Sequence, residues 1–258
     1  MHFTNNILSF FLSILISLVL IQCKTINKKN NLENIKKPTL TTKQDKRFKE
    51  YYTSGELKTE GQHFENKKTG KWVSYYENGE TKSIRNYKDG KLDGYQKMDY
   101  SQVLYMEGIS KNGQKTGTWK SFLKENNQLK YLKKFDDFGN ATGEWKGYYD
   151  SGELNFVENY LNNKPYGEQT KYFKNGNISS RGEKRNGKND GIWEYYYDNG
   201  NILCEREFKN GVDNGKYVQY FKNGKIHKIG TYKNFKKVGT WKIYNEQSDL
   251  IETVKYEN

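Results

Sequence analysis

The sequence predicts an all-β protein, an elongated single-layer meander of about nine tandem β-hairpins with a 24-residue period. Three observations lead to this prediction. The 258-residue chain contains 22 Tyr and 24 Gly but only 2 Pro. One unit recurs from about residue 46 to the end, with glycines at a nearly constant interval. Only 33% of the residues are hydrophobic, which is too few for a two-layer core and suits a thin array with partly exposed aromatic rings.

The unit is clearest between residues 191 and 215. Its first half, Ile192–Tyr197, is β-branched and aromatic, which is the composition of a strand. We expect a two-residue type I′ turn at Asn199-Gly200, because Asn and Gly best tolerate the positive φ that both central residues need. A return strand follows over residues 201–208, and Asn210-Gly211 opens a second turn. One unit is therefore one hairpin plus the link to the next.

Glycines anchor the unit, and we expect them to set its backbone geometry. The anchors are Gly70, Gly94, Gly117, Gly143, Gly167, Gly191, Gly215 and Gly239. A tryptophan ladder follows two positions after an anchor: Trp72, Trp119, Trp145, Trp193 and Trp241, with Tyr95, Gln169 and Tyr217 expected in the other repeats. A tyrosine stripe follows five positions after an anchor: Tyr75, Tyr148, Tyr172, Tyr196, Tyr220 and Tyr244.

The two sets of rings are expected to lie on opposite faces, because side chains alternate along a strand. We expect the tryptophan ladder to hold neighbouring hairpins together, since Gly182 and Gly230 in the return strands leave room for a ring. The tyrosine stripe is the candidate binding surface. Tyr has few torsions to freeze and offers both an apolar face and a hydroxyl. The alternative is that the tyrosines also serve only to hold the sheet together.

The N-terminal 23 residues differ from the rest of the chain. Residues 7–21 form an almost unbroken apolar run, which is short for a membrane span and typical of a signal-peptide core. The run ends near Cys23 and resembles a bacterial lipoprotein signal, which implies cleavage before Cys23 and acylation of its thiol. An uncleaved anchor helix or a signal without lipid is the alternative, and either one exports the repeats.

The segment 24–45 is rich in Lys, Asn and Thr, and it predicts a flexible basic tether that lies against anionic lipid headgroups. Residues 46–258 make up the repeat domain. The formal net charge is +13, but the charge is not gathered on one face, so we expect no nucleic-acid partner. The sequence thus predicts an exported protein, membrane-anchored in the bacterial cell envelope.

No residue constellation for catalysis stands out in the repeats. The histidines His2, His63 and His227 are too far apart in a linear array to meet at one site. Cys204 is the cysteine that remains once Cys23 is acylated, and its position alongside Ile202 favours a small packed side chain. We therefore expect no enzyme, no metal site and no cofactor.

The repeat also resembles a known family. The run G-x-W-x-x-Y-Y-x-x-G-x-I, closed by Y-x-x-G-K-x-x-G as in residues 87–94, is similar to the bacterial variant of the MORN repeat. Chains of this type are often labelled YwqK-like antitoxins of toxin-antitoxin systems. The resemblance covers nearly all of residues 50–258. It implies a MORN-like solenoid, a twisted single-layer sheet used for protein or lipid contact, and it implies no reaction.

We therefore expect a non-enzymatic, envelope-anchored interaction scaffold that binds a protein partner or a lipid surface along an aromatic face. A cell-wall or glycan-binding module is an alternative, because short hairpin repeats with Trp and Tyr-Tyr also resemble cell-wall-binding repeats. An antitoxin-like protein is the other. The sequence leaves the partner and the oligomeric state open.

Overall fold

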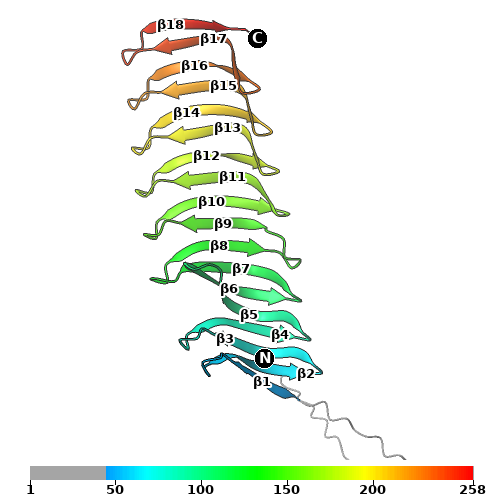
Figure 1. The fold of residues 1–258 in the computed structure, drawn as a ribbon. Helices are drawn as coiled ribbons and strands as arrows, with labels where there is room; N and C mark the ends of the chain where they lie inside the picture. The colour runs from blue at the N-terminus through cyan, green and yellow to red at the C-terminus, as the bar shows by residue number, and fades with distance from the viewer. Residues whose placement is uncertain (1–44, 258) are drawn as a thin grey trace, which may run out of the picture. The chain divides into compact units, whose positions relative to one another are not determined.

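A computed structural model describes residues 45–257, which form one sheet of eighteen antiparallel strands (Figure 1). Each strand pairs with the strands before and after it in the chain, so the sheet is a simple meander of nine hairpins. The fold prediction is confirmed. The strands are β1 (Lys46–Tyr51), β2 (Leu57–Phe64), β3 (Lys67–Tyr75), β4 (Thr81–Lys88), β5 (Lys91–Asp99), β6 (Leu104–Lys111), β7 (Gln114–Leu123), β8 (Leu129–Phe135), β9 (Gly143–Tyr148), β10 (Leu154–Leu161), β11 (Lys164–Tyr172), β12 (Ile178–Arg185), β13 (Lys188–Tyr196), β14 (Ile202–Lys209), β15 (Val212–Tyr220), β16 (Ile226–Lys233), β17 (Lys236–Tyr244) and β18 (Leu250–Tyr256).

The predicted leader, Cys23 and the tether up to residue 44 lie outside the described residues. Across residues 45–257, no helix is long and apolar enough to cross a membrane.

The turn within each hairpin differs from the one expected. Gly200 N–H donates to the Tyr197 carbonyl at 3.0 Å, and Tyr197 N–H donates to the Asn201 carbonyl at 2.8 Å. Gly200 has a φ of +89°, whereas Asn199 is not among the residues with positive φ. This is a type I turn followed by a glycine bulge, so the predicted type I′ turn at Asn199-Gly200 is wrong. The strands close one residue earlier than expected and leave a three-residue loop.

The type I′ turn that was expected within the hairpin occurs instead between hairpins. Lys209 pairs with Val212, which leaves a two-residue loop of Asn210 and Gly211. Both loop residues have positive φ, +51° and +84°. That combination is a type I′ turn. The Asn-Gly preference therefore acts here, at the link from one hairpin to the next.

The anchor glycines lie inside strands. Gly191 has a φ of +70°, and a Cβ built on it would meet no atom within 4 Å, so conformation and not crowding requires glycine there. Arg181 pairs with Glu194 while Glu183 pairs with Asp190, so one residue of β12 faces three of β13. The glycine marks a bulge, which bends the strand. The anchor glycine therefore sets the backbone geometry of the strand.

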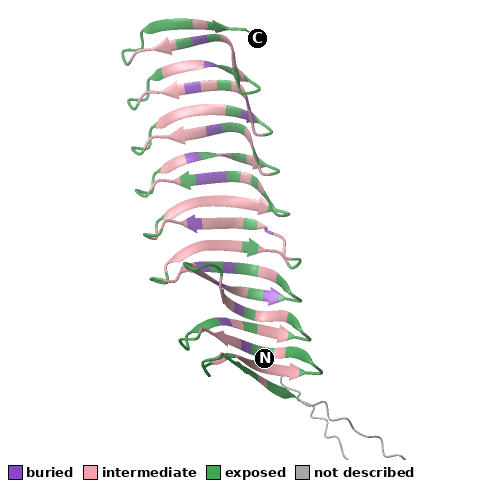
Figure 2. Ribbon diagram, in the orientation of Figure 1, coloured by how far each residue is buried: buried purple, intermediate pink, exposed green. Residues whose placement is uncertain are grey.

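The core is thin. Figure 2 shows buried residues as short bands within the strands, while the turns at both edges are exposed. The most buried aromatic side chains belong to the tryptophan ladder, with 2–4% of their surface exposed: Trp72, Trp119, Trp193 and Trp241. Nearly all other residues are half-buried or exposed. Neighbouring hairpins therefore depend on one another for nearly all of their burial.

Tyrosines outside the strands join successive hairpins at one edge. The Tyr197 hydroxyl donates to the carbonyl of Tyr220 at 3.0 Å, 23 residues further along the chain. The same bond joins Tyr52 to Tyr75 at 2.8 Å and Tyr149 to Tyr172 at 2.7 Å. The residue six after the anchor thus leaves the strand and lies along the edge, where it fixes the distance between turns.

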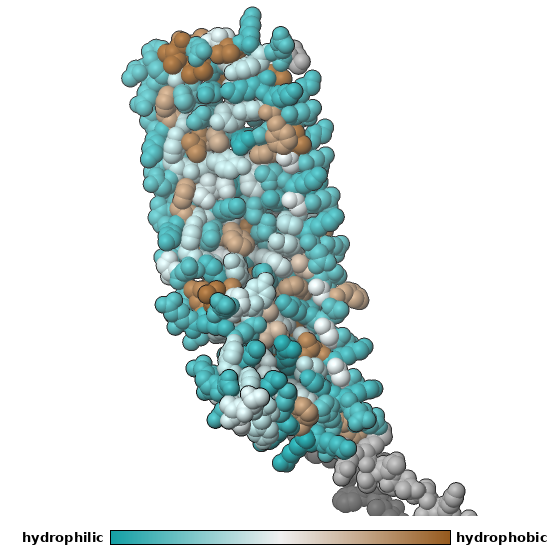
Figure 3. All heavy atoms as spheres, in the orientation of Figure 1, coloured by the Kyte–Doolittle hydropathy of each residue, from teal (hydrophilic) through white to brown (hydrophobic). Residues whose placement is uncertain are grey.

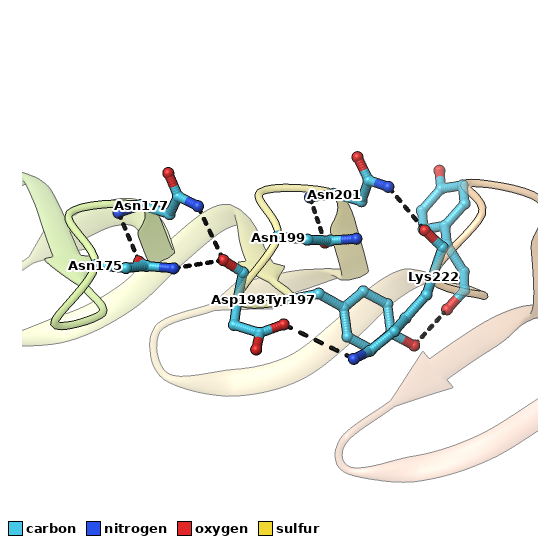
Figure 4. A network of polar contacts seen from close by, with 8 residues as sticks. Asn175, Asn177, Tyr197, Asp198, Asn199, Asn201 and Lys222 are labelled. Carbon is cyan, nitrogen blue, oxygen red and sulfur yellow. Dashed lines mark hydrogen bonds and ion pairs between the residues drawn. The ribbon is translucent and has the colours of Figure 1, made fainter.

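Asparagines tie the same turns together (Figure 4). The side-chain amides of Asn175 and Asn177 both donate to the Asp198 carbonyl at 2.8 Å. The amide of Asn201 donates to the Lys222 carbonyl at 2.7 Å. The turns of β11–β12, β13–β14 and β15–β16 are therefore hydrogen-bonded in series, which satisfies carbonyl groups that the strands leave unpaired.

Candidate binding surface

One face of the sheet is closed by the tryptophan ladder. A Cβ on Gly182 would lie 2.4 Å from the Trp193 ring, so the ring rests directly on the glycine backbone. The Trp193 indole N–H donates to the Glu183 carbonyl at 3.0 Å. The same ring-on-glycine contact occurs at Gly61 with Trp72, Gly108 with Trp119 and Gly230 with Trp241.

Lysines cover the outer side of these rings. The ammonium groups of Lys68, Lys115 and Lys237 lie 4.2, 4.6 and 4.8 Å from the ring centroids of Trp72, Trp119 and Trp241. Such contacts are attractive through the ring quadrupole. Lys133 takes the glycine position before Trp145, and burial lowers the pKa of its ammonium. The rings are thus enclosed on both sides, which indicates a structural role.

Where the ladder lacks Trp, the residue opposite it in the preceding strand is charged instead of glycine. Gln96 pairs with Arg85, and it is fully buried at 0% exposure. Tyr95 is 39% exposed, and its hydroxyl donates to Glu107 at 2.8 Å. The expectation that Tyr95 completes the ladder is wrong, because it follows Gly94 by one residue and so lies on the opposite face. The other two cases are Gln169, which pairs with Glu158, and Tyr217, which pairs with Arg206.

The Tyr217 repeat contains an enclosed ion pair. Arg206 is hydrogen-bonded to Asp213, whose side chain is among the buried polar groups. Cys204 lies two residues before Arg206 in the same strand, opposite Tyr195, and burial raises the pKa of its thiol to about 11. A thiol in such a setting is a poor nucleophile.

The tyrosine stripe lies on the other face, and its rings are half-buried instead of fully exposed. The Tyr196 hydroxyl donates to Glu194 at 2.7 Å, and Tyr75 donates to Glu60 at 2.8 Å. Burial and the bond to Glu194 raise the pKa of Tyr196 to about 12. The hydrogen bond to Glu60 raises the pKa of Tyr75, and burial raises that of Tyr220. The acids that partner these hydroxyls had no signal in the repeat pattern.

Charges of both signs run beside the stripe. Arg181 forms an ion pair with Glu194, and the Tyr196 hydroxyl donates to the same carboxylate. These residues belong to one row of cross-strand partners that follows the array from end to end. The charged members of the row are Lys49, Glu60, Lys97, Glu107, Lys120, Lys146, Arg181, Glu194, Glu205 and Lys242.

The stripe is not brought together as one patch. Its members stand two strands apart, one on each hairpin, and Phe122 takes the position after Gly117. After Gly94 the position is Asp99, which interrupts the line of rings. On the face in view in Figure 3, hydrophobic residues form small separate groups among hydrophilic ones. Such a surface can contact a long partner at regular points.

Among residues 45–257 there is no group of three His, Cys, Asp or Glu side chains that could hold a metal ion. His63 packs against Phe48 and Trp72 near one end of the array, and His227 packs against Phe221 near the other. Both histidines therefore serve as ring contacts.

Comparison with known proteins gives one family. Five segments match the MORN repeat variant: residues 44–66, 68–89, 141–162, 189–210 and 213–234. Each segment covers one hairpin, namely β1–β2, β3–β4, β9–β10, β13–β14 and β15–β16. The unmatched hairpins β7–β8, β11–β12 and β17–β18 pair in the same way, with a register shift near the end of the first strand, whereas β5–β6 pairs without one.

The comparison with curated proteins returned no match. Among solved structures, a chain in the crystal structure of TcdB2-TccC3-Cdc42 is similar at 9% identity and a TM-score of 0.16. The match covers 78% of this chain and 13% of that chain. A score this low carries no structural argument. The five family matches do not depend on it: five of the nine hairpins match the MORN repeat variant.

Proposed function

We propose that this protein is a non-enzymatic interaction scaffold, exported and held at a bacterial cell envelope through acylated Cys23, that binds a protein partner or lipid surface along the tyrosine stripe. Its MORN-variant repeats suit a repeat-based binding scaffold. The observation that carries the proposal is the recurrence of a half-exposed tyrosine at one position of successive hairpins, on the face opposite the enclosed tryptophans.

The surface chemistry supports recognition of a long partner. Tyr196 and Tyr75 combine an apolar ring with a hydroxyl held by a carboxylate, so these two rings have a fixed direction before a partner arrives. Little torsional freedom remains to be lost on binding. Contacts that are weak singly add when several hairpins engage the same partner.

The test replaces Tyr172, Tyr196 and Tyr220 together with Ser in the full chain. We expect the variant to recover at least about tenfold less of its partner in pull-downs from envelope extracts, because three adjacent contacts are removed. The matched control replaces Tyr87, Tyr160 and Tyr232 with Phe, which keeps the rings of the tryptophan face and should leave recovery unchanged.

An intact fold by circular dichroism with unchanged partners would exclude the tyrosine stripe as the binding surface. Sedimentation with peptidoglycan or polysaccharide distinguishes the glycan-binding alternative. Loss of glycan sedimentation in the tyrosine variant, with protein partners unchanged, would assign the stripe to a glycan.

A further inference from the structure

The interruption of the tyrosine stripe is itself a formed site. Asp99 stands five residues after its anchor, where six other hairpins carry Tyr. The β5–β6 ladder pairs Gly94 through Asp99 with Ser110 through Tyr105 without a register shift, unlike the neighbouring ladders β3–β4 and β7–β8. Tyr105 therefore lies directly opposite Asp99. The strands also change their stacking direction around β5 to β7 (Figure 1).

A hollow of about 350 Å³ occupies the place of the missing ring. The aromatic residues of its lining are Tyr76 and Tyr105, and Tyr105 is stacked on Phe122 with centroids 5.1 Å apart. Ile84 and Met98 add apolar surface. The aromatic walls are thus held in place by the sheet and by ring stacking.

Cations outnumber anions around the hollow. Lys82, Lys97 and Lys124 line it together with Asp99 and Glu80. Lys124 is bonded to Asp99 at 2.5 Å, which neutralises that pair. Glu80 accepts a hydrogen bond from Asn78 in its own turn.

The other two lysines rest on rings instead of carboxylates. Lys97 lies 4.5 Å from the Tyr105 centroid and Lys82 lies 5.5 Å from the Tyr76 centroid. Within the described part of the chain, neither has a carboxylate oxygen within 4 Å. Both ammonium groups can therefore receive an acidic ligand without breaking an ion pair.

We propose that this hollow binds a carboxylate side chain from an acidic segment of a protein partner that lies along the tyrosine stripe. The proposal rests on the proposed function and names the charge of its partner. The surrounding surface favours a protein segment over a lipid bilayer. An anionic bilayer would contact many hairpins at once and would meet the mixed charges of the row, including Glu60, Glu107, Glu194 and Glu205. A single carboxylate side chain that enters the hollow meets Lys82 and Lys97, the two lysines there that rest on rings.

The test measures fluorescence anisotropy of a labelled eight-glutamate peptide with the full chain in non-ionic detergent. An eight-glutamine peptide serves as the uncharged probe. Lys97→Met should weaken binding of the glutamate peptide about tenfold, because it removes one charge-assisted contact. Lys171→Met removes an equal charge from the other face and should change binding less than about twofold.

Asp99→Tyr provides the sharper test. It restores the ring found in other hairpins, so circular dichroism should report an intact sheet, and it fills the hollow. It also makes the protein more positive by one charge. Binding through general attraction would therefore strengthen, whereas binding in the hollow should weaken about tenfold. Unchanged or tighter binding by this variant would overturn the proposal.

Two further outcomes separate this proposal from the one on which it rests. If Asp99→Tyr weakens binding to phosphatidylglycerol vesicles but not to the glutamate peptide, the ligand is a lipid and the proposal is wrong. The triple tyrosine variant could keep its protein partners while Asp99→Tyr weakens binding of the glutamate peptide. That outcome would exclude the stripe as the binding surface and would support the hollow as the carboxylate site.

Discussion

Tyrosine hydroxyls are the groups whose protonation the fold alters most clearly. Burial raises the pKa of Tyr95, Tyr160, Tyr196 and Tyr217 to about 12, against about 10 for an ordinary tyrosine. The folded chain therefore keeps these protons at a pH where the unfolded chain releases them. The stabilisation is complete below pH 10 and is lost as the pH rises toward 12.

We predict that the urea midpoint of unfolding falls between pH 10 and pH 12. Other groups can also change charge at high pH, so the comparison needs the variant Tyr196→Phe with Tyr217→Phe. This variant keeps every lysine and should show a smaller fall, because it lacks two of the four phenols whose pKa is raised to about 12. An equal fall in both proteins would contradict the assignment to tyrosine.

At the scale of one hairpin, the contact between glycine and tryptophan is the unit of stability. Gly182 accepts the Trp193 ring, whereas Gly191 is required only for its positive φ. The two glycines therefore make different demands on a substitution. An added methyl group at Gly182 meets a ring, and one at Gly191 meets no neighbouring atom but strains the backbone.

We predict that Gly182→Ala lowers the free energy of unfolding by about 1–3 kcal/mol through overpacking. In a double-mutant cycle with Trp193→Gln, its cost should shrink by about 1 kcal/mol or more, because Gln does not reach the added methyl group. Gly191→Ala is the control, with a cost of about 1–2 kcal/mol that Trp193→Gln leaves unchanged. Additive effects for Gly182 would show that ring and glycine do not compete for space.

The sequence pattern was enough to predict the hairpins, their period and the opposite faces of the two ladders. It failed for the turn type, because Asn-Gly occurs both in the turn within a hairpin and in the turn between hairpins. Strand pairing, and not the dipeptide, decides the loop length. The pattern marked Gly191 as a position that sets backbone geometry, but it did not show that the glycine lies in a bulge inside the strand. The half-burial of Tyr196 depends on Glu194, which no repeat position marks. Asp99 could have been found by counting five residues from Gly94.

At the scale of the whole array, the hairpins are not interchangeable. A ladder Trp packs on a Gly of the preceding return strand, as Trp241 does on Gly230. Gln96 and Tyr217 instead lie opposite an Arg of the preceding strand, as Tyr217 does opposite Arg206. Trp145, which follows Lys133, is the exception. The hairpin of β13–β14 begins with Trp193 and ends with Arg206, so a second copy placed after it would bring Trp193 against an Arg instead of a Gly. The two hairpins β13–β16 begin with Trp193 and end with Gly230, so a second copy of this pair would bring Trp193 against a Gly.

We predict that duplicating residues 191–214 destabilises the protein, because the copied Trp193 would meet Arg206. The mismatch should cost about 1–3 kcal/mol, measured as a lower urea midpoint. Duplicating residues 191–238 should leave the midpoint unchanged or higher, because the copied Trp193 would meet Gly230 and nearest neighbours stabilise such arrays. Equal midpoints for the two insertions would show that each hairpin accepts any neighbour.

Under the proposed function, the two-strand spacing of the tyrosine stripe would set the distance between contact points on its ligand. Neighbouring strands lie about 4.8 Å apart, so successive tyrosines recur about every 9.6 Å. An extended strand covers this distance in about three residues of 3.3 Å. Its side chains alternate between two faces, so residues three apart point in opposite directions and could not all face the tyrosines. A polyproline II segment rises about 3.1 Å per residue with three residues per turn. It would present the same side to each tyrosine, one turn per hairpin.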